Sequence, residues 1–274
     1  MDPATIIGLI IAFGSIGSMV FMEGSSLSSL FLPAPMILVF GATIAVGIAS
    51  GTIADMIRAA KAIPIAMLGK LAQPAGLIDE VVAIAEKARK EGLLALEAEA
   101  QNVKDPFLKS ALQNIADGMD AEELRTLLEE QVATAEREQR AAAKFFNGLG
   151  GYAPTVGIIG TVISLTHVLE HLSNPATLGP SIAGAFVATL WGVLSANILW
   201  LPIGARLSRL ADLNIERMHV LLEGVLAVQE GSQPRVVGER LRAMINVADK
   251  GKADKDSGSK GAKAVKSKPL KEAA

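Results

Sequence analysis

Two histidines and a glutamate stand close together in the stretch HVLEH. His167 and His171 are four residues apart with Glu170 between them, so a helix would place all three on one face. Imidazole and carboxylate groups at this spacing can ligate a transition metal. They also stand where a long apolar segment ends, and polar residues are expected at such an end. We therefore interpret them as the end of a helix and predict no metal site.

Hydroxyl and amide side chains are the other groups that can take part in chemistry, and they lie inside two apolar stretches without Asp, Glu, Lys or Arg. A proton or cation path is normally marked by an ionisable residue within the bilayer. If this chain helps to conduct ions, the carboxylate should come from another polypeptide. Alternatively, the hydroxyls only bond to their own helix backbone. The polar residues are Thr155, Thr161, Ser164, Thr189, Ser195 and Asn197.

Motifs typical of enzymes are missing from the sequence. Gly69-Lys70 is followed by Leu71, so the phosphate-binding loop of nucleotide hydrolases does not occur. There is no cysteine, which excludes thiol catalysis and thiolate metal sites. Aromatic residues make up 4% and the net charge is −2, so a nucleic-acid partner is not expected. We predict no catalytic residues, no bound cofactor and no enzymatic activity.

The apolar stretches form a hairpin over residues 150–204, and the chain is organised around it. Each arm has roughly 20 apolar residues, enough to cross a bilayer core of about 30 Å. Pro154 lies early in the first arm and Pro202 late in the second, so antiparallel arms bring both prolines to one membrane face. Small residues recur every fourth position along the second arm, so another helix can approach closely there, and we expect a polypeptide that supplies a carboxylate to pack against this small-residue stripe. The stripe consists of Gly184, Ala188, Gly192 and Ala196.

Two further apolar runs, 3–22 and 36–54, raise the number of predicted spans to four. All 26 Lys and Arg residues lie in 58–144 and 206–271. Because Lys and Arg concentrate on cytoplasmic flanks, both termini and the long middle segment should be cytoplasmic. We expect an all-α, multi-pass protein of the cell inner (cytoplasmic) membrane.

The middle segment is too long for a connection and should be a folded helical insert. Asp105-Pro106 should begin one of its helices and Gly118 should end it, and Asp120 with Glu123 should form a capping box for the long helix that follows. The predicted segments are 1–54 (transmembrane helices 1 and 2), 55–148 (cytoplasmic helical domain), 149–204 (transmembrane helices 3 and 4), 205–250 (cytoplasmic helical segment) and 251–274 (disordered Lys-rich tail).

Two features allow both a structural and a functional interpretation. The charges in RKEGLLALE, which include Arg89, Lys90 and Glu97, are either a solvated helix face or a docking surface of alternating charge. Pro154 is either a first-turn proline or part of a hinge, and Pro202 should bend or end its helix.

Taken together, these features resemble the MotA/PomA family of flagellar motor stator subunits, within the MotA/TolQ/ExbB proton channel superfamily. The resemblance covers nearly the whole chain apart from the Lys-rich tail. It is carried by ARKEGLLALE (88–97), APTVGIIGT (153–161), VATLWG (187–192), LPI (201–203) and QPRVV (233–237).

The resemblance implies a ring of such subunits, expected to be a homopentamer, around a dimer of a MotB-like protein whose aspartate carries H+ or Na+. It also implies that the insert pushes on the rotor protein FliG. By motif position, Arg89, Lys90 and Glu97 are the expected rotor-interaction residues. Pro154, Thr161, Thr189 and Pro202 are the expected ion-pathway and torque-coupling residues, and a threonine at 161 leans toward sodium.

Two alternative functions stay open from the sequence. An ExbB/TolQ-like energiser of outer-membrane processes has a similar core, but such proteins have three spans and an outward N-terminus. A passive membrane scaffold would tolerate apolar replacements of the hydroxyls and loss of either proline.

Overall fold

The computed structural model describes residues 4–24, 26–69, 74–173 and 175–245. The described residues form helices joined by short turns and include no strand, which confirms the all-α prediction. The chain divides into two compact units. The hairpin unit comprises Met1–Leu71 with Glu136–Asp212, and the insert unit comprises Ala72–Ala135 with Leu213–Ala274. The predicted tail, 251–274, lies outside the described residues, as do residues 246–250.

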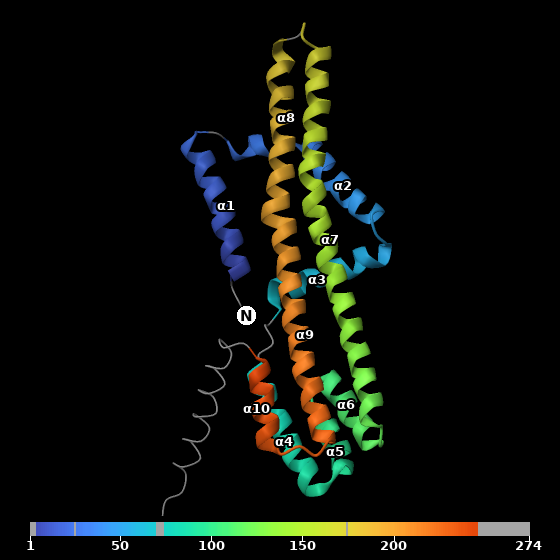
Figure 1. Cartoon of the computed structure of the whole chain (residues 1–274). Helices are drawn as coiled ribbons and strands as arrows, with labels where there is room; N and C mark the ends of the chain where they lie inside the picture. Colours follow the sequence, from blue (N-terminus) through green and yellow to red (C-terminus); the bar gives the residue numbers. More distant parts are fainter. Residues whose placement is uncertain (1–3, 25, 70–73, 174, 246–274) are drawn as a thin grey trace, which may run out of the picture. The chain divides into compact units, whose positions relative to one another are not determined.

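The hairpin unit is built around α7 and α8, which run antiparallel side by side (Figure 1). The first arm is the C-terminal part of α7, and the second continues from α8 through a π-helical turn into α9. The elements that contribute to this unit are α1 (Ala4–Met22), η1 (Leu27–Leu30), α2 (Pro33–Ala49), α3 (Ile53–Leu68), α7 (Ala121–Glu170), α8 (Pro175–Leu194), the π turn η3 (Ser195–Trp200) and α9 (Leu201–Gln229).

Helices α7 and α9 both pass from one unit into the other. The predicted segment boundaries at 148/149 and 204/205 therefore fall inside continuous helices. Pro154 lies in the interior of α7, so its interpretation as a first-turn proline is wrong. Pro202 does not end its helix, because α9 runs on to Gln229 and the π turn immediately before it accommodates the proline.

Two helices are long and apolar enough to cross a membrane, namely Ala121–Glu170 and Leu178–Gln229. Only 22% and 33% of their most apolar windows are buried within the chain. Their apolar side chains therefore face outward, as Ile158, Val162 and Phe186 do. The apolar helices Ile6–Met22 and Pro33–Ala49 are shorter.

The insert unit surrounds an apolar core to which every one of its longer helices contributes. Its own elements are α4 (Pro74–Glu91), η2 (Leu93–Ala95), α5 (Leu96–Asn102), α6 (Pro106–Ala116) and α10 (Pro234–Met244), together with the ends of α7 and α9. Fully buried core side chains are Ile78, Val81, Leu96, Leu108, Leu112, Leu124, Leu128, Leu221 and Leu241.

The predicted helix boundaries of the insert unit are confirmed. The carboxylate of Asp105 accepts hydrogen bonds from the backbone N–H groups of Phe107 and Leu108, at 2.9 and 3.0 Å. Gly118 follows α6 with a φ of +83°, a left-handed conformation that favours glycine. Asp120 then accepts a hydrogen bond from the N–H of Glu122 at the start of α7.

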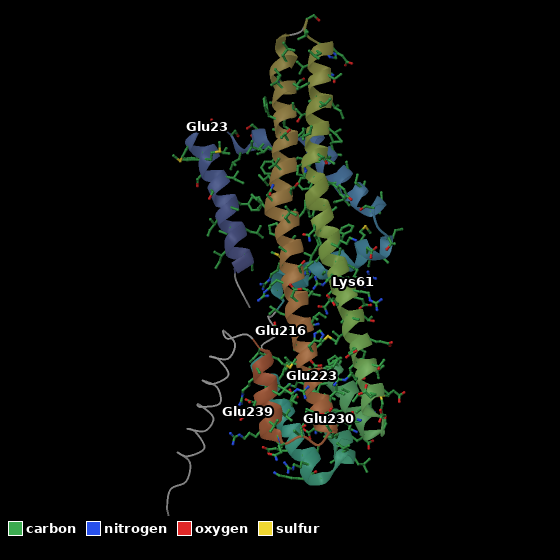
Figure 2. All side chains as sticks on the ribbon, in the orientation of Figure 1. Glu23, Lys61, Glu216, Glu223, Glu230 and Glu239 are labelled. Atoms are coloured by element: carbon green, nitrogen blue, oxygen red, sulfur yellow. The ribbon has the colours of Figure 1, made fainter. Side chains whose placement is uncertain are left out.

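Glu223 holds three helices of the insert unit together. Figure 2 shows it on α9 between Glu216 and Glu230. Its carboxylate pairs with Arg125 of α7 at 3.5 Å and with Arg240 of α10 at 2.5 Å. The two ion pairs fix the ends of α7 and α10 against α9.

Candidate functional site

Thr161 and Thr189 face each other across the hairpin, and their hydroxyl oxygens are hydrogen-bonded. The Thr161 hydroxyl also lies 3.1 Å from the carbonyl oxygen of Gly157 on its own helix and 3.1 Å from that of Ala185 on α8. A carbonyl oxygen only accepts, and a hydroxyl has one proton. The proton of Thr161 can therefore be donated to only one of these three oxygen atoms, and either threonine can donate the bond between the two hydroxyls. Both side chains are half-buried.

Glycines make this contact possible, because α7 and α8 cross where neither helix has a side chain. A Cβ on Gly157 would lie 2.9 Å from the carbonyl oxygen of Ala188, and one on Gly192 would lie 2.8 Å from that of Ala153. One turn further, a Cβ on Gly160 would meet the Cβ of Ala188 at 2.8 Å. The small residues thus bring the two backbones together as the spacing predicts.

The close approach corrects one expectation about the partner. All four residues of the small-residue stripe are buried within this single chain, and α7 covers Ala188 and Gly192. A polypeptide that supplies a carboxylate therefore cannot dock on that stripe. It has to reach the hydroxyl pair from the side on which Thr161 and Thr189 are partly exposed.

Several other polar side chains of the two arms only satisfy their own helix. The Thr155 hydroxyl donates to the carbonyl group of Tyr152 at 2.7 Å, and the Asn197 amide donates to that of Val193 at 2.9 Å. Ser195 donates to the carbonyl group of Gly192. The backbone-bonding interpretation holds for these groups, whereas Thr161 in addition makes bonds across the hairpin.

The two prolines lie at the same level of the hairpin. A Cβ on Gly150, one turn before Pro154, would meet the side chain of Leu201, which directly precedes Pro202. At the π turn the N–H of Leu201 donates to the carbonyl group of Ala196, five residues earlier. Since Pro202 has no N–H, the widened turn redistributes the hydrogen bonds at this level.

The charged residues of RKEGLLALE lie around a turn of the insert unit. Arg89 and Lys90 lie in the last turn of α4, Gly92 turns the chain with a φ of +88°, and Glu97 lies in α5. The three charged side chains are exposed. Among the described residues neither Arg89 nor Glu97 has an ion-pair partner, while Lys90 approaches only Glu86, at 4.0 Å. The side chain of Leu94, at the tip, is 73% exposed.

A single ion pair braces this turn. The ammonium group of Lys87 on α4 donates to the carboxylate of Glu99 on α5, at 2.6 Å. The hydrogen bond with Glu99 raises the pKa of Lys87 above its ordinary value. The brace joins the two helices on either side of Arg89 and Glu97, so it fixes the turn that carries them. Sequence spacing does not reveal this pair, because its members belong to different helices.

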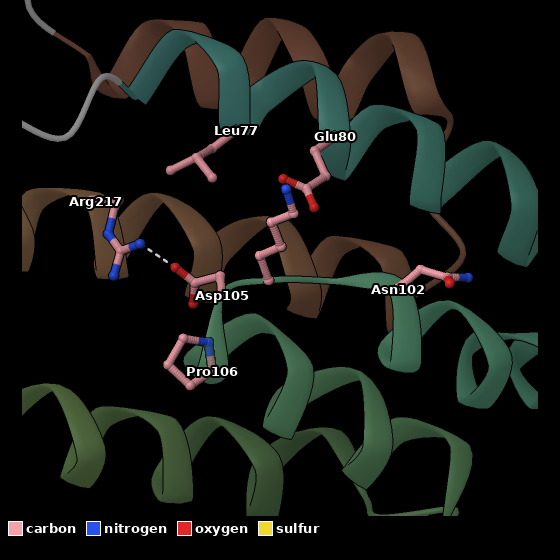
Figure 3. A pocket seen from close by; sticks show the side chains of 7 residues that line it. Leu77, Glu80, Asn102, Asp105, Pro106 and Arg217 are labelled. Carbon is pink, nitrogen blue, oxygen red and sulfur yellow. Dashed lines mark hydrogen bonds and ion pairs between the residues drawn. The ribbon is translucent and has the colours of Figure 1, made fainter.

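A cleft of about 480 Å³ lies behind the start of α6 (Figure 3). Within it the guanidinium group of Arg217 on α9 points toward the carboxylate of Asp105 and pairs with it. Asp105 thereby joins two roles, since it also caps α6. The cleft is further lined by Leu77, Glu80, Asn102, Lys104 and Pro106. Asp105 and Arg217 are 112 residues apart in the sequence, so no local pattern could have predicted their ion pair.

Comparison with known proteins decides the family. Motility protein A of Bacillus subtilis (strain 168) is 35% identical over 255 residues, which cover 91% of this chain and 93% of that protein. The sequence model of the MotA/TolQ/ExbB proton channel family matches residues 99–220. The chain belongs to this family.

Further comparisons place it near the motility members of the family. Chemotaxis protein PomA of Vibrio alginolyticus is 31% identical over 246 residues, 90% of this chain and 96% of that protein. The structure of the flagellar MotAB stator complex from Bacillus subtilis contains a chain that is 34% identical, with a TM-score of 0.84 over 92% of this chain and 99% of that one. The C. jejuni MotAB structure matches with a TM-score of 0.85 at 27% identity, over 90% of this chain and 97% of that one.

Proposed function

We propose that this chain is a stator subunit of a bacterial flagellar motor. With a MotB-like partner it forms an ion channel that converts transmembrane ion flow, of H+ or Na+, into torque on the rotor. Relatives named motility protein A and PomA align with it over nearly their whole length, which supports this function rather than that of an outer-membrane energiser. As a channel-forming subunit it has no catalytic site of its own.

The observation that carries the proposal is the hydroxyl pair in a hairpin whose interior has no Asp, Glu, Lys or Arg residue. From Lys144 to Arg206 the only Asp, Glu, Lys or Arg is Glu170, at the end of α7. Thr161 and Thr189 present oxygen atoms that can coordinate a cation or a hydrated proton, but they provide no proton-binding charge. The pair is therefore one half of an ion site, and the partner supplies the carboxylate.

The proposed topology has four spans with both termini in the cytoplasm. Helices α1 and α2 contain 19 and 17 residues, so they extend about 28 and 25 Å. Apolar side chains of α1 such as Ile10 and Phe21 are 65% and 85% exposed, which favours a lipid environment or a neighbouring subunit. Lys and Arg flank the spans on one side only, which supports the orientation.

The torque-generating surface is proposed to be the turn that carries Arg89, Lys90 and Glu97, with FliG as its partner. These side chains are exposed and held on a braced turn, so their charges remain available to a second protein. Pro154 and Pro202 are proposed to couple ion passage to movement of α7 and α9. A ring of five copies around the partner dimer completes the proposal.

The decisive experiment is complementation of a stator-deleted cell with this chain and its own partner. Swimming speed would be measured while sodium is varied at constant proton motive force. We expect motility to return; a speed that rises with sodium identifies Na+ as the ion, and a speed indifferent to sodium identifies H+. Cells that receive the partner alone are the control. Membrane insertion and partner binding without any swimming would contradict the motor function and favour the energiser.

A further inference from the structure

The outer end of α7, opposite the charged end of the hairpin, carries three potential metal ligands. One ring nitrogen each of His167 and His171 and one carboxylate oxygen of Glu170 lie within 4.8 Å of one another. All three side chains are exposed, and the two imidazole rings are 4.3 Å apart at their centroids. The cluster is separate from the hydroxyl pair, which lies further along the same helix at Thr161.

The hydrogen bonding of His171 prepares it for a metal. Its Nδ1 lies 3.0 Å from the backbone carbonyl oxygen of His167. Because that oxygen can only accept, Nδ1 carries the proton, and in the neutral ring Nε2 keeps a free lone pair. Histidines that ligate metals usually donate their second N–H to a carbonyl or carboxylate group in this way.

The position of the three ligands at the C-terminal end of α7 also favours a bound cation electrostatically. Glu170 is the last residue of α7, where carbonyl groups without helical partners concentrate negative potential. A cation bound beside this end is favoured by the helix dipole and by the Glu170 carboxylate. The ligand atoms have to move together somewhat, since two ligands of one tetrahedral zinc ion are about 3.3 Å apart. Exposed side chains make such an adjustment by small torsional changes.

We propose that His167, Glu170 and His171 form a binding site for a divalent transition metal ion, with Zn2+ as the ion that best fits two imidazoles and one carboxylate. Such a donor set leaves a fourth position for water. The sequence alone favoured the end of a helix, and the structure adds the oriented imidazole and the convergence of three ligands. The site does not depend on the motor function, because it concerns only metal binding by this chain.

The test is a Zn2+ titration of the full chain in its complex with the partner, without affinity tags, monitored by competition with a chromophoric chelator. We expect one saturable site per copy of the chain, and the visible absorption of tetrahedral Co2+ when cobalt replaces zinc. His167→Gln and His171→Gln should each weaken binding at least tenfold, and Glu170→Gln should weaken it less. All three positions are exposed, so the variants should fold as the original chain does.

His219→Gln is the matched control. Its Nδ1 makes the same kind of bond, to the carbonyl oxygen of Ile215 at 2.9 Å, and within the described residues it belongs to no such ligand cluster. This variant should bind Zn2+ as the original chain does. Absence of saturable binding, or binding that survives loss of both His167 and His171, would overturn the proposal. Because the readout is binding and not motility, its failure is distinct from failure of the motor function.

Discussion

The hydroxyl groups of Thr161 and Thr189, 28 residues apart in the chain, are hydrogen-bonded to each other across the hairpin. This small polar link lies within an apolar hairpin and joins α7 to α8, which leads through the π turn into α9. If the hydroxyl pair binds the ion as proposed, the ion competes with this link. The proposal then couples ion binding to the contact between α7 and the second arm.

Replacement of either threonine by valine tests the link. Thr161→Val and Thr189→Val keep the shape of the side chain but remove the hydroxyl, so we expect ion flow and swimming to fall sharply. Serine keeps the hydroxyl, so Thr161→Ser should retain a substantial part of the activity. Thr166→Val is the matched control, because Thr166 donates only to the carbonyl group of Val162 on the exposed side of the same helix. Equal losses in Thr166→Val and Thr161→Val would contradict a specific role for the pair.

The types of residue at this site were predictable, but their pairing was not. The few hydroxyl side chains of the hairpin are easily recognised in its apolar sequence, and the family resemblance singled out Thr161 and Thr189. Which hydroxyls meet depends on the register of α7 against α8, and that register depends on backbone contact at Gly157 and Gly192. For the same reason the sequence suggested an external partner on the small-residue stripe, although the chain's own helix fills it.

In the insert unit, the helix boundaries were predictable from the sequence, but the contacts between helices were not. Its helix boundaries followed from Asp105 and Gly118, because caps and left-handed glycines act within a few residues. The ion pairs that hold the helices together, such as Asp105 with Arg217, join distant segments and have no local signature. The sequence also placed a segment boundary at 148/149, inside the continuous helix α7. The residues change there from charged to apolar, and composition alone does not distinguish such a change from the end of a helix.

Gly157→Ala should separate the arms of the hairpin. The added methyl group would lie 2.9 Å from the carbonyl oxygen of Ala188, so the helices must move apart, which costs about 1–3 kcal/mol. Gly151→Ala is the control, since its Cβ would meet nothing within 4 Å and alanine favours a helix. Thermal unfolding of the purified complex should show a loss only for Gly157→Ala. Similar unfolding temperatures for the two variants would mean that the contact is less tight than the structure indicates.

Pro202→Ala should preserve assembly and stop rotation. Alanine restores a backbone N–H just after the π turn, so the turn can close into a regular α-helix and lose its special geometry. We expect normal amounts of the complex in the membrane, copurification of the partner, and little or no swimming. Normal motility would show that the proline has no part in coupling.

The brace between Lys87 and Glu99 should be lost at high pH. The pKa of Lys87 is raised above 10.5, so the bond stabilises the turn at neutral pH and is lost as the pH rises through the raised pKa. Amide hydrogen exchange at Leu93–Ala95 should accelerate in Lys87→Met at neutral pH. The difference between the variant and the original chain should vanish above the pKa of Lys87. A difference that persists there would assign the effect to packing.

Arg89→Glu should impair torque without unfolding the insert unit. Arg89 is exposed and, within the described residues, has no ion-pair partner, so reversal of its charge changes only what a second protein meets. We expect reduced swimming, with partial recovery when an opposing charge on the rotor protein is also reversed. Lys109→Glu, the same charge change on an exposed face of α6, should swim normally. If Arg89→Glu swims as well as Lys109→Glu, these charges form a solvated face, and the rotor meets another surface.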